Sequence, residues 1–245
     1  MDKNEEFQQE VRDNIANLSE DQDLQALGRI FLREVSPYKY AYNFTWMGRP
    51  IIQFPQDMMA MQEIIWRVQP DLIIETGIAH GGSLIFYASM LELLGDTDGL
   101  VLGIDIDIRA HNKAAIEAHP MAKRIRMIQG SSIDENMVRQ VREIAEGKKR
   151  ILVTLDSNHT HDHVLQELEL YSPLVTKDSY LVVFDTAVED MPRSLSAERP
   201  WGVGDNPKTA VWEFLKNNDR FEIDRDVQNK ILITVAPDGY LKRIK

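Results

Sequence analysis

The stretch LIIETGIAHGGS, residues 72–83, decides the fold. A continuous apolar run that ends in a glycine-rich turn is typical of a buried parallel strand leading into a helix. Three of the chain's 13 glycines fall at Gly77, Gly81 and Gly82, where backbone without a Cβ can approach a ligand closely, and Ser83 is placed to cap the helix. The spacing matches neither GxGxxG nor GxxxxGKS. Alone, the turn fits a ligand loop and a purely structural turn equally well.

On either side of this stretch, short apolar runs alternate with helical patterns. We expect strands at 72–76, 100–105, 124–129, in the 150s up to Asp156, at 180–185 and at 230–235, and helices at 83–94, 109–118, 133–146, 161–171 and 207–217. This alternation predicts an α/β fold with a mostly parallel sheet and helices on both faces. The elements around 221–224 and 230–235 are too close for a crossover helix, so we expect an antiparallel C-terminal hairpin.

The N-terminal region has a different character. Apolar residues spaced by three and four between Phe7 and Phe31 predict two amphipathic helices. The following segment, 38–55, is rich in aromatics, Gly and Pro and has no regular period, so it is either a cover over the core or a lid against substrate. A Met-rich helix is expected from Asp57 to Val68. We therefore divide the chain into a cap-like extension, residues 1–56, and a main domain, residues 57–245.

Composition excludes several classes of protein. The chain has 245 residues and a formal charge of −11, which argues against nucleic acid as a partner. It has no cysteine, so disulfides, thiolate metal sites and a cysteine nucleophile are excluded. The acidic, polar start is unlike a signal peptide, and no apolar run reaches the roughly 18–20 residues that span a bilayer. We expect a soluble, cytoplasmic protein without stable membrane insertion.

Acidic residues stand at the ends of the expected strands. Asp105, Asp156 and Asp185 end three of them, and Glu75 lies one residue before the end of another. In an open α/β sheet, ligands bind beyond the carboxyl ends of the strands. Asp105, which follows the glycine turn by one strand, is placed to hold the two hydroxyls of a ribose. It could equally be a turn or cap residue, and Asp107 could take the same role.

Three histidines, His159, His161 and His163, follow Asp156. One interpretation is a solvated helix start; a three-histidine zinc site is disfavoured because i, i+2, i+4 converges only on a strand. We prefer Asp156 as a ligand of a divalent cation and His159 as a general base aimed into the same cleft. On this interpretation His161 and His163 point along the helix that follows. Asp185 and Thr186 supply further oxygens, and hard oxygen ligands suit Mg²⁺ or Mn²⁺.

The motifs ETGIAHGGS, GIDIDIRAHN, IQGSSID, LDSNHTHDHV and VVFDT together resemble the cephalosporin hydroxylase / rhamnosyl O-methyltransferase family of class I S-adenosylmethionine-dependent methyltransferases. The resemblance covers about Tyr38 to the C-terminus and implies a Rossmann-like seven-stranded methyltransferase sheet. It implies S-adenosylmethionine as cofactor. The residues that it places around this cofactor are Glu75, Gly77, Ala79, Gly81, Ser83, Asp105, Ser132 and Asp134.

The resemblance also bears on the metal. It implies Asp156 and Asp185 as ligands and His159 as the base three residues after the first aspartate. Family members often have an acidic pair at the fifth strand end, but here its first position is Phe184. Two alternatives follow: a site that uses Asp185 with Thr186, or weak or absent metal binding.

The function implied is an O-methyltransferase acting on a hydroxyl of a sugar or a glycosylated small molecule, assisted by a divalent metal, in a homo-oligomer. Candidate substrate walls are Tyr40, Tyr42, Trp46 and the segment 199–207, which could equally be a surface loop. The alternative is a non-catalytic S-adenosylmethionine-binding partner of a biosynthetic enzyme, which would need Asp105 and the glycines but not His159. An NAD enzyme ranks low because GxGxxG is absent.

Overall fold

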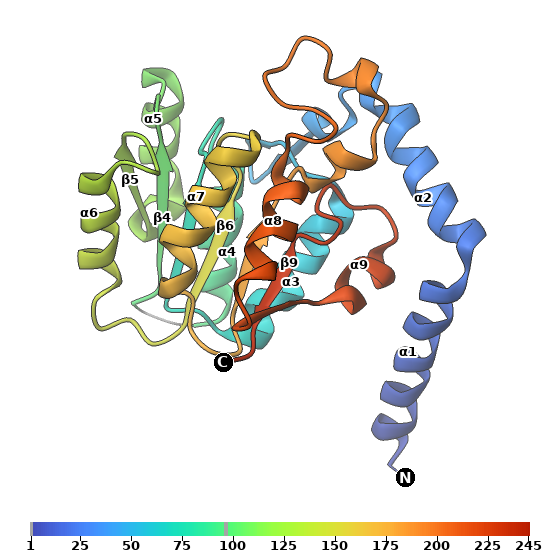
Figure 1. The fold of residues 1–245 in the computed structure, drawn as a ribbon. Helices are drawn as coiled ribbons and strands as arrows, with labels where there is room; N and C mark the ends of the chain where they lie inside the picture. The colour runs from blue at the N-terminus through green and yellow to red at the C-terminus, as the bar shows by residue number, and fades with distance from the viewer. Residues whose placement is uncertain (1, 96–97) are drawn as a thin grey trace.

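The centre of the molecule is a seven-stranded sheet. The computed structural model describes residues 2–95 and 98–245, and its strands run in the order β5-β4-β3-β6-β7-β9-β8 (Figure 1). Their bounds are β3 Leu72–Thr76, β4 Leu100–Asp105, β5 Ile125–Gln129, β6 Ile151–Leu155, β7 Tyr180–Val183, β8 Phe221–Ile223 and β9 Tyr240–Arg243. β3 to β7 are parallel, and β9 is antiparallel to both of its neighbours, β7 and β8. The expected fold class is confirmed.

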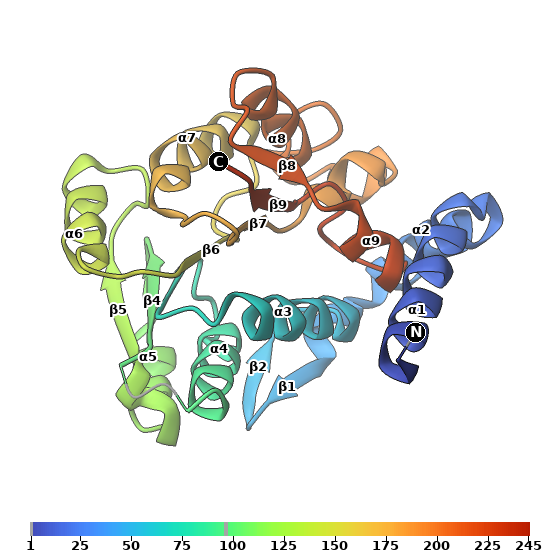
Figure 2. The same ribbon diagram turned by 90° about the horizontal axis from the view of Figure 1, so that it is seen from below.

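Two helical layers cover the sheet, as its near-continuous apolar strands require. One face carries α3 Pro55–Val68, α4 Gly82–Leu93 and α5 Ala110–Glu117; the other carries α6 Glu135–Ala145, α7 His161–Tyr171 and α8 Pro207–Lys216 (Figure 2). Every residue of β3, β6 and β7 is buried between these layers. Short 3-10 helices complete the described main domain: η3 Pro120–Arg124, η4 Ser172–Leu174, η5 Thr186–Asp190 and η6 Arg193–Leu195.

The strand expected at 230–235 is wrong. Its first residues belong to helix α9, Arg225–Ile231, and the antiparallel partner of β8 is β9, at Tyr240–Arg243. A buried carboxylate explains the difference. Asp57, in the first turn of α3, accepts hydrogen bonds from Thr234 Oγ1 and from the Val235 backbone N–H, 3.0 Å away, so that these groups do not join a strand ladder. Leu232, with φ of +58°, ends the helix just before them. A tertiary contact thus overrides the β-propensity of KILITV.

The N-terminal region contains the two expected helices, α1 Lys3–Glu20 and α2 Gln22–Val35, then η1 Ser36–Tyr38 and η2 Tyr40–Asn43. The segment without a regular period also holds a hairpin, β1 Phe44–Trp46 and β2 Arg49–Ile51. Its two turn residues, Met47 and Gly48, both have positive φ, the geometry that joins twisted antiparallel strands most tightly.

The arm formed by α1 and α2 lies along the edge of the domain beside α9 (Figures 1 and 2). It docks closely at one crossing, where a Cβ on Gly28 of α2 would stand 2.5 Å from the backbone oxygen of Leu232. α1 has no fully buried residue, and Phe7 is largely exposed. Within the described residues, no helix is long and apolar enough to cross a membrane.

Candidate active site

The carboxyl ends of β3, β4, β6 and β7 are neighbours, so the acidic residues that end these strands lie along one edge of the sheet. Beyond β3 and β4 stands the glycine turn, and beyond β6 and β7 stand two carboxylates and a histidine. The edge therefore has two halves, which we call the β3–β4 half and the β6–β7 half.

Close packing dictates glycine in the turn after β3. Gly77 has φ of +91°, and a Cβ on it would stand 2.0 Å from the backbone oxygen of Asp156. Gly81 has φ of +79° and caps α4, while a Cβ on Gly82 would meet the backbone oxygen of Pro50 at 2.2 Å. The turn therefore lies tightly between β6 and the N-terminal hairpin, and its glycines have a structural reason whatever they bind.

Glu75 and Ser83 form a buried pair beneath this turn. The Ser83 hydroxyl donates to Glu75 Oε2 at 2.7 Å, so Ser83 does not cap α4, contrary to our expectation; the capping position is Gly81, one residue before the helix begins. Burial raises the pKa of Glu75 to about 8, with a further contribution from Asp105 and an opposing one from the Ser83 bond. Glu75 Oε1 is buried without a hydrogen-bond partner among the described residues.

Asp105 holds the glycine turn in place. Its Oδ2 accepts the backbone N–H groups of Ile78, at 2.8 Å, and Ala79, at 3.2 Å. Its Oδ1 accepts the N–H of Asp107, whose own side chain is exposed. Ala79 has φ of +45°, an uncommon conformation for a residue with a Cβ, and the bond to Asp105 helps to fix it. An ionised carboxylate offers about four acceptor sites, so capacity remains for a ligand hydroxyl.

A cavity of about 170 Å³ lies beside Asp105 and is lined by Ile104, Asp105, Ile106, Gly130, Ser131, Ser132, Ser157, Asn158, His163 and Trp201. Ser132 therefore lines the same cavity as Asp105. Asp134 is not in this lining; its Oδ1 caps α6 by accepting the N–H groups of Asn136 and Met137. These two bonds engage Asp134 Oδ1 as the N-cap acceptor of α6.

His163 belongs to this cavity, which the sequence analysis missed. Its Nε2 is 3.1 Å from Ser132 Oγ, 3.3 Å from Ser157 Oγ and 3.5 Å from Glu167 Oε1, so the expectation that it merely points along the helix is wrong. Glu167 is fully buried on the inner face of α7, which it shares with Val164, Leu168 and Tyr171. A glutamate four residues after a histidine, on an otherwise apolar helix face, is the signal that could have found this pair.

The β6–β7 half of the edge gathers Asp156, His159 and Asp185. One ligand atom from each lies within 4.8 Å of the others, and His159 Nε2 is 3.1 Å from Asp185 Oδ2. Burial, then repulsion by Asp185 and by Glu75, raises the pKa of Asp156 well above its usual range. Among the described residues no lysine or arginine forms an ion pair with either aspartate. Two hard carboxylates and an imidazole without a protein counter-ion suit a divalent cation.

Two neighbours of Asp185 complete this half. Phe184 is buried in the core and offers no ligand. Thr186 is also buried, and its hydroxyl donates to the Pro237 carbonyl at 2.6 Å, so its proton is already engaged. From the N-terminal region, Gln53 reaches the cluster: its Nε2 lies 3.4 Å from Asp156 Oδ2.

One of the expected substrate walls contacts this cluster. Trp201 meets the His159 ring edge-on, with ring centroids 4.8 Å apart, and it also lines the cavity beside Asp105. Its segment is held by bonds from Gly204 N–H to Glu189 and from His161 N–H to Asp205. Trp46 instead donates to Ser89 of α4 and packs on Phe86, and Tyr40 packs among Phe31, Phe44 and Phe54.

The sheet order, the glycine turn and the acidic strand end beside it define a Rossmann-like, S-adenosylmethionine-dependent methyltransferase. The family model "Rhamnosyl O-methyltransferase/CmcI" matches residues 38–244, and the chain belongs to this family. The membership confirms the resemblance drawn from the sequence and the prediction of an O-methyltransferase.

Individual relatives agree with this assignment. A rhamnosyl O-methyltransferase of Mycobacterium bovis is 32% identical over 205 residues, which cover 81% of this chain and 78% of the relative. That of Mycobacterium leprae is 31% identical over 200 residues, covering 81% and 82%. A solved structure of CmcI with Mg and SAM is 18% identical, with a TM-score of 0.59 over 83% of this chain and 78% of the other, and supports the fold.

Proposed function

We propose that the chain transfers the methyl group of S-adenosylmethionine to a hydroxyl of a sugar, of the rhamnosyl class, with the help of a divalent cation. The acceptor oxygen attacks the methyl carbon, an O–C bond forms, the C–S bond breaks, S-adenosylhomocysteine leaves and the hydroxyl proton passes to the protein. The observation that carries this proposal is the convergence of Asp156, His159 and Asp185 beside the glycine turn, on the same sheet edge.

The β3–β4 half is proposed to bind the cofactor. Its cavity and its tightly held turn suit a nucleoside, with Asp105 on the ribose and Ser132 toward the adenine. The proposed cofactor-binding residues are Glu75, Gly77, Ala79, Gly81, Ser83, Asp105, Ser132 and Asp134. For Ser83 and Asp134 the contacts described above support an indirect role, in holding Glu75 and the start of α6.

The β6–β7 half is proposed to bind and deprotonate the acceptor. Asp156 and Asp185, with the Thr186 oxygen as a weaker candidate, would hold Mg²⁺ or Mn²⁺, which when bound lowers the pKa of a hydroxyl and fixes its direction. His159 lies in this cluster, with Nε2 3.1 Å from Asp185 Oδ2, and its imidazole is proposed to take the proton of a hydroxyl bound there. Asp185 would then stabilise the imidazolium across their 3.1 Å contact.

The first experiment separates an enzyme from a non-catalytic cofactor-binding partner. Calorimetry with S-adenosylmethionine and with NAD tests the cofactor, and transfer of labelled methyl to rhamnose and to rhamnosides tests the reaction. We expect S-adenosylmethionine to bind, NAD not to bind, EDTA to abolish transfer and Mg²⁺ or Mn²⁺ to restore it. Full transfer in EDTA would refute the metal assignment, and binding without transfer to any sugar would favour the partner protein.

We also propose that copies of the chain associate through the N-terminal arm. The arm exposes Phe7, Leu27, Ile30 and Phe31, and a second copy of the chain would bury this apolar surface. Light scattering should give an oligomer for the intact chain and a smaller species for a variant with Phe7, Leu27 and Ile30 changed to serine. A monomeric intact chain would contradict the proposal.

A further inference from the structure

A second polar cavity lies outside the site described above. It measures about 330 Å³ and is enclosed by α2, η5, the start of α8, α9 and the segment that leads into β9. We call it the α2–α9 cavity. The charged residues in its wall are Arg29, Asp190, Lys208, Arg225 and Asp238.

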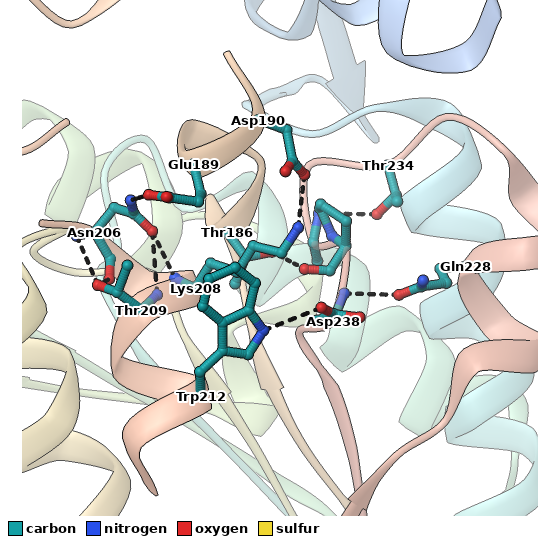
Figure 3. Close-up of polar contacts among 12 residues, drawn as sticks. Thr186, Glu189, Asp190, Asn206, Lys208, Thr209, Trp212, Gln228, Thr234 and Asp238 are labelled. Carbon is teal, nitrogen blue, oxygen red and sulfur yellow. Dashed lines mark hydrogen bonds and ion pairs between the residues drawn. The ribbon is translucent and has the colours of Figure 1, made fainter. Parts of the chain in front are cut away.

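Lys208 lies deep in this cavity and is only 7% exposed. Its Nζ is 2.7 Å from Asp190 Oδ2 and 5.4 Å from the centre of the Trp212 ring (Figure 3). Burying an ammonium group is costly unless its donors find acceptors. Among the described residues Asp190 is its hydrogen-bond acceptor, and an ammonium group carries three donors, so donor capacity remains unused.

Two arginines stand on other walls of the cavity. Arg225, from α9, donates through Nη1 to Asp238 Oδ1 at 3.0 Å. Trp212 Nε1 donates to the other oxygen of Asp238 at 3.2 Å (Figure 3). Arg29, from α2, is exposed and has no hydrogen bond or ion pair within the described part of the chain. The lining therefore has three cations against two carboxylates and an excess of N–H donors, in a chain whose formal charge is −11.

The cavity and the Asp156–His159–Asp185 cluster share a wall. Asp185 immediately precedes η5, and Asp190 ends it; Ala187 and Pro237, which receives the Thr186 hydrogen bond, line the cavity. At about 2 Å of rise per residue in a 3-10 helix, Asp190 lies about 10 Å along the chain axis from Asp185. The cluster and the cavity therefore lie at the two ends of one short helix, and a ligand that reached from one to the other would place a hydroxyl at the cluster and a charged group in the cavity.

We propose that the α2–α9 cavity binds a phosphoryl group carried by the acceptor sugar. Cationic donors from α2, α8 and α9 approach from three sides, which matches the three outward oxygens of a tetrahedral phosphoryl group better than the two in-plane oxygens of a carboxylate. The link to the acceptor rests on the proposed function, whereas binding of the anion can be measured without methyl transfer.

The test uses calorimetry on the full chain, with rhamnose, rhamnose 1-phosphate, inorganic phosphate and glucuronate as probes. We expect rhamnose 1-phosphate to bind at least about 10-fold more tightly than rhamnose, inorganic phosphate to compete with it and added salt to weaken it. Equal affinity for the two sugars would overturn the proposal. Tighter binding of glucuronate would overturn the choice of a phosphoryl group, and binding of inorganic phosphate without any gain for the phosphorylated sugar would overturn the link to the acceptor.

Variants of the cavity arginines test whether rhamnose 1-phosphate binds in the α2–α9 cavity. Arg29→Gln removes an exposed side chain without a described partner, so folding should be unaffected, and we expect about 10-fold weaker binding of rhamnose 1-phosphate. Arg29→Lys should recover part of the loss. Arg12→Gln, on exposed α1, is the matched control and should bind as the wild type does. Wild-type affinity in Arg29→Gln combined with Arg225→Gln would overturn the proposal. If the anion binds but no sugar is methylated, the anion site is supported and the proposed reaction is refuted.

Discussion

The two halves of the sheet edge differ in what surrounds their carboxylates. In the β3–β4 half, Asp105 accepts three backbone N–H groups and Glu75 accepts the Ser83 hydroxyl. In the β6–β7 half, Asp156 and Asp185 stand close together, and their mutual repulsion helps to raise the pKa of Asp156. The turn of the first half is preorganised, although Glu75 Oε1 has no hydrogen-bond partner among the described residues. In the second half, two neighbouring carboxylates repel each other until a cation or a proton binds there. Binding and chemistry are thus divided between neighbouring strands.

The largest effect is expected in the β6–β7 half, at His159. His159→Ala should lower kcat by roughly 10²- to 10⁴-fold, because a positioned proton acceptor is lost, and should leave S-adenosylmethionine binding nearly intact. Steady-state methyl transfer measures kcat, and calorimetry with S-adenosylmethionine measures the cofactor binding.

His161→Ala is the matched control for this prediction. The His161 ring faces Thr209 and Glu213 of α8 rather than the carboxylates, so most activity should remain. A His159→Ala protein that methylates at the wild-type rate would show that the two aspartates activate the acceptor without a histidine base.

A Glu75→Gln variant tests whether the buried glutamate lowers the free energy of unfolding. Its folded pKa is raised from 4.5 to about 8, so the neutral form is favoured and stability is lost as pH rises from about 4.5 to 8. Glu75→Gln should remove this loss and be more stable than the wild type above pH 8, by about 3–5 kcal/mol at most. Denaturant unfolding at pH 5 and pH 8.5 measures it, with exposed Glu222→Gln as control. An equal difference between variant and wild type at both pH values would contradict the prediction.

Variants of Asp105 test whether the β3–β4 half binds S-adenosylmethionine. Asp105→Ala should weaken S-adenosylmethionine binding by at least ~10-fold, through lost ribose contacts and through release of the turn that it holds at Ile78 and Ala79. Asp105→Asn keeps an acceptor for one of these bonds and should fall between. Exposed Asp107→Ala should bind normally in calorimetry. Unchanged affinity in Asp105→Ala would remove this residue from the cofactor site.

The smallest effect is expected at His163, on the border of the two halves. His163→Ala removes a partner of Ser132 and leaves the buried Glu167 carboxylate with fewer donors, so cofactor affinity should fall roughly fivefold, about 1 kcal/mol. The KM for S-adenosylmethionine should rise while kcat holds. A fall in kcat with an unchanged KM would place His163 with the catalytic cluster instead.

The sequence predicted best what depends on local pattern. The parallel strands, their acidic ends and the glycine turn follow from apolar runs and residue type, and the first three helices after the arm begin within a few residues of their expected positions. The errors come from contacts between distant segments. Asp57 draws Thr234 and Val235 out of a strand, and Glu75 takes the Ser83 hydroxyl from the helix start. Such contacts leave no periodic trace in the sequence.

The insertion of β9 between β7 and β8 has a consequence for how the molecule folds. β8 precedes β9 in the chain, and β9 is its sheet neighbour among the described strands, so β8 is joined to the rest of the sheet through β9. The two antiparallel strands are therefore expected to join the sheet as one unit, and the edge of β7 lacks this strand partner until β9 pairs with it. In hydrogen exchange, the amides of β8 and β9 should gain and lose protection together, as a single late-forming unit.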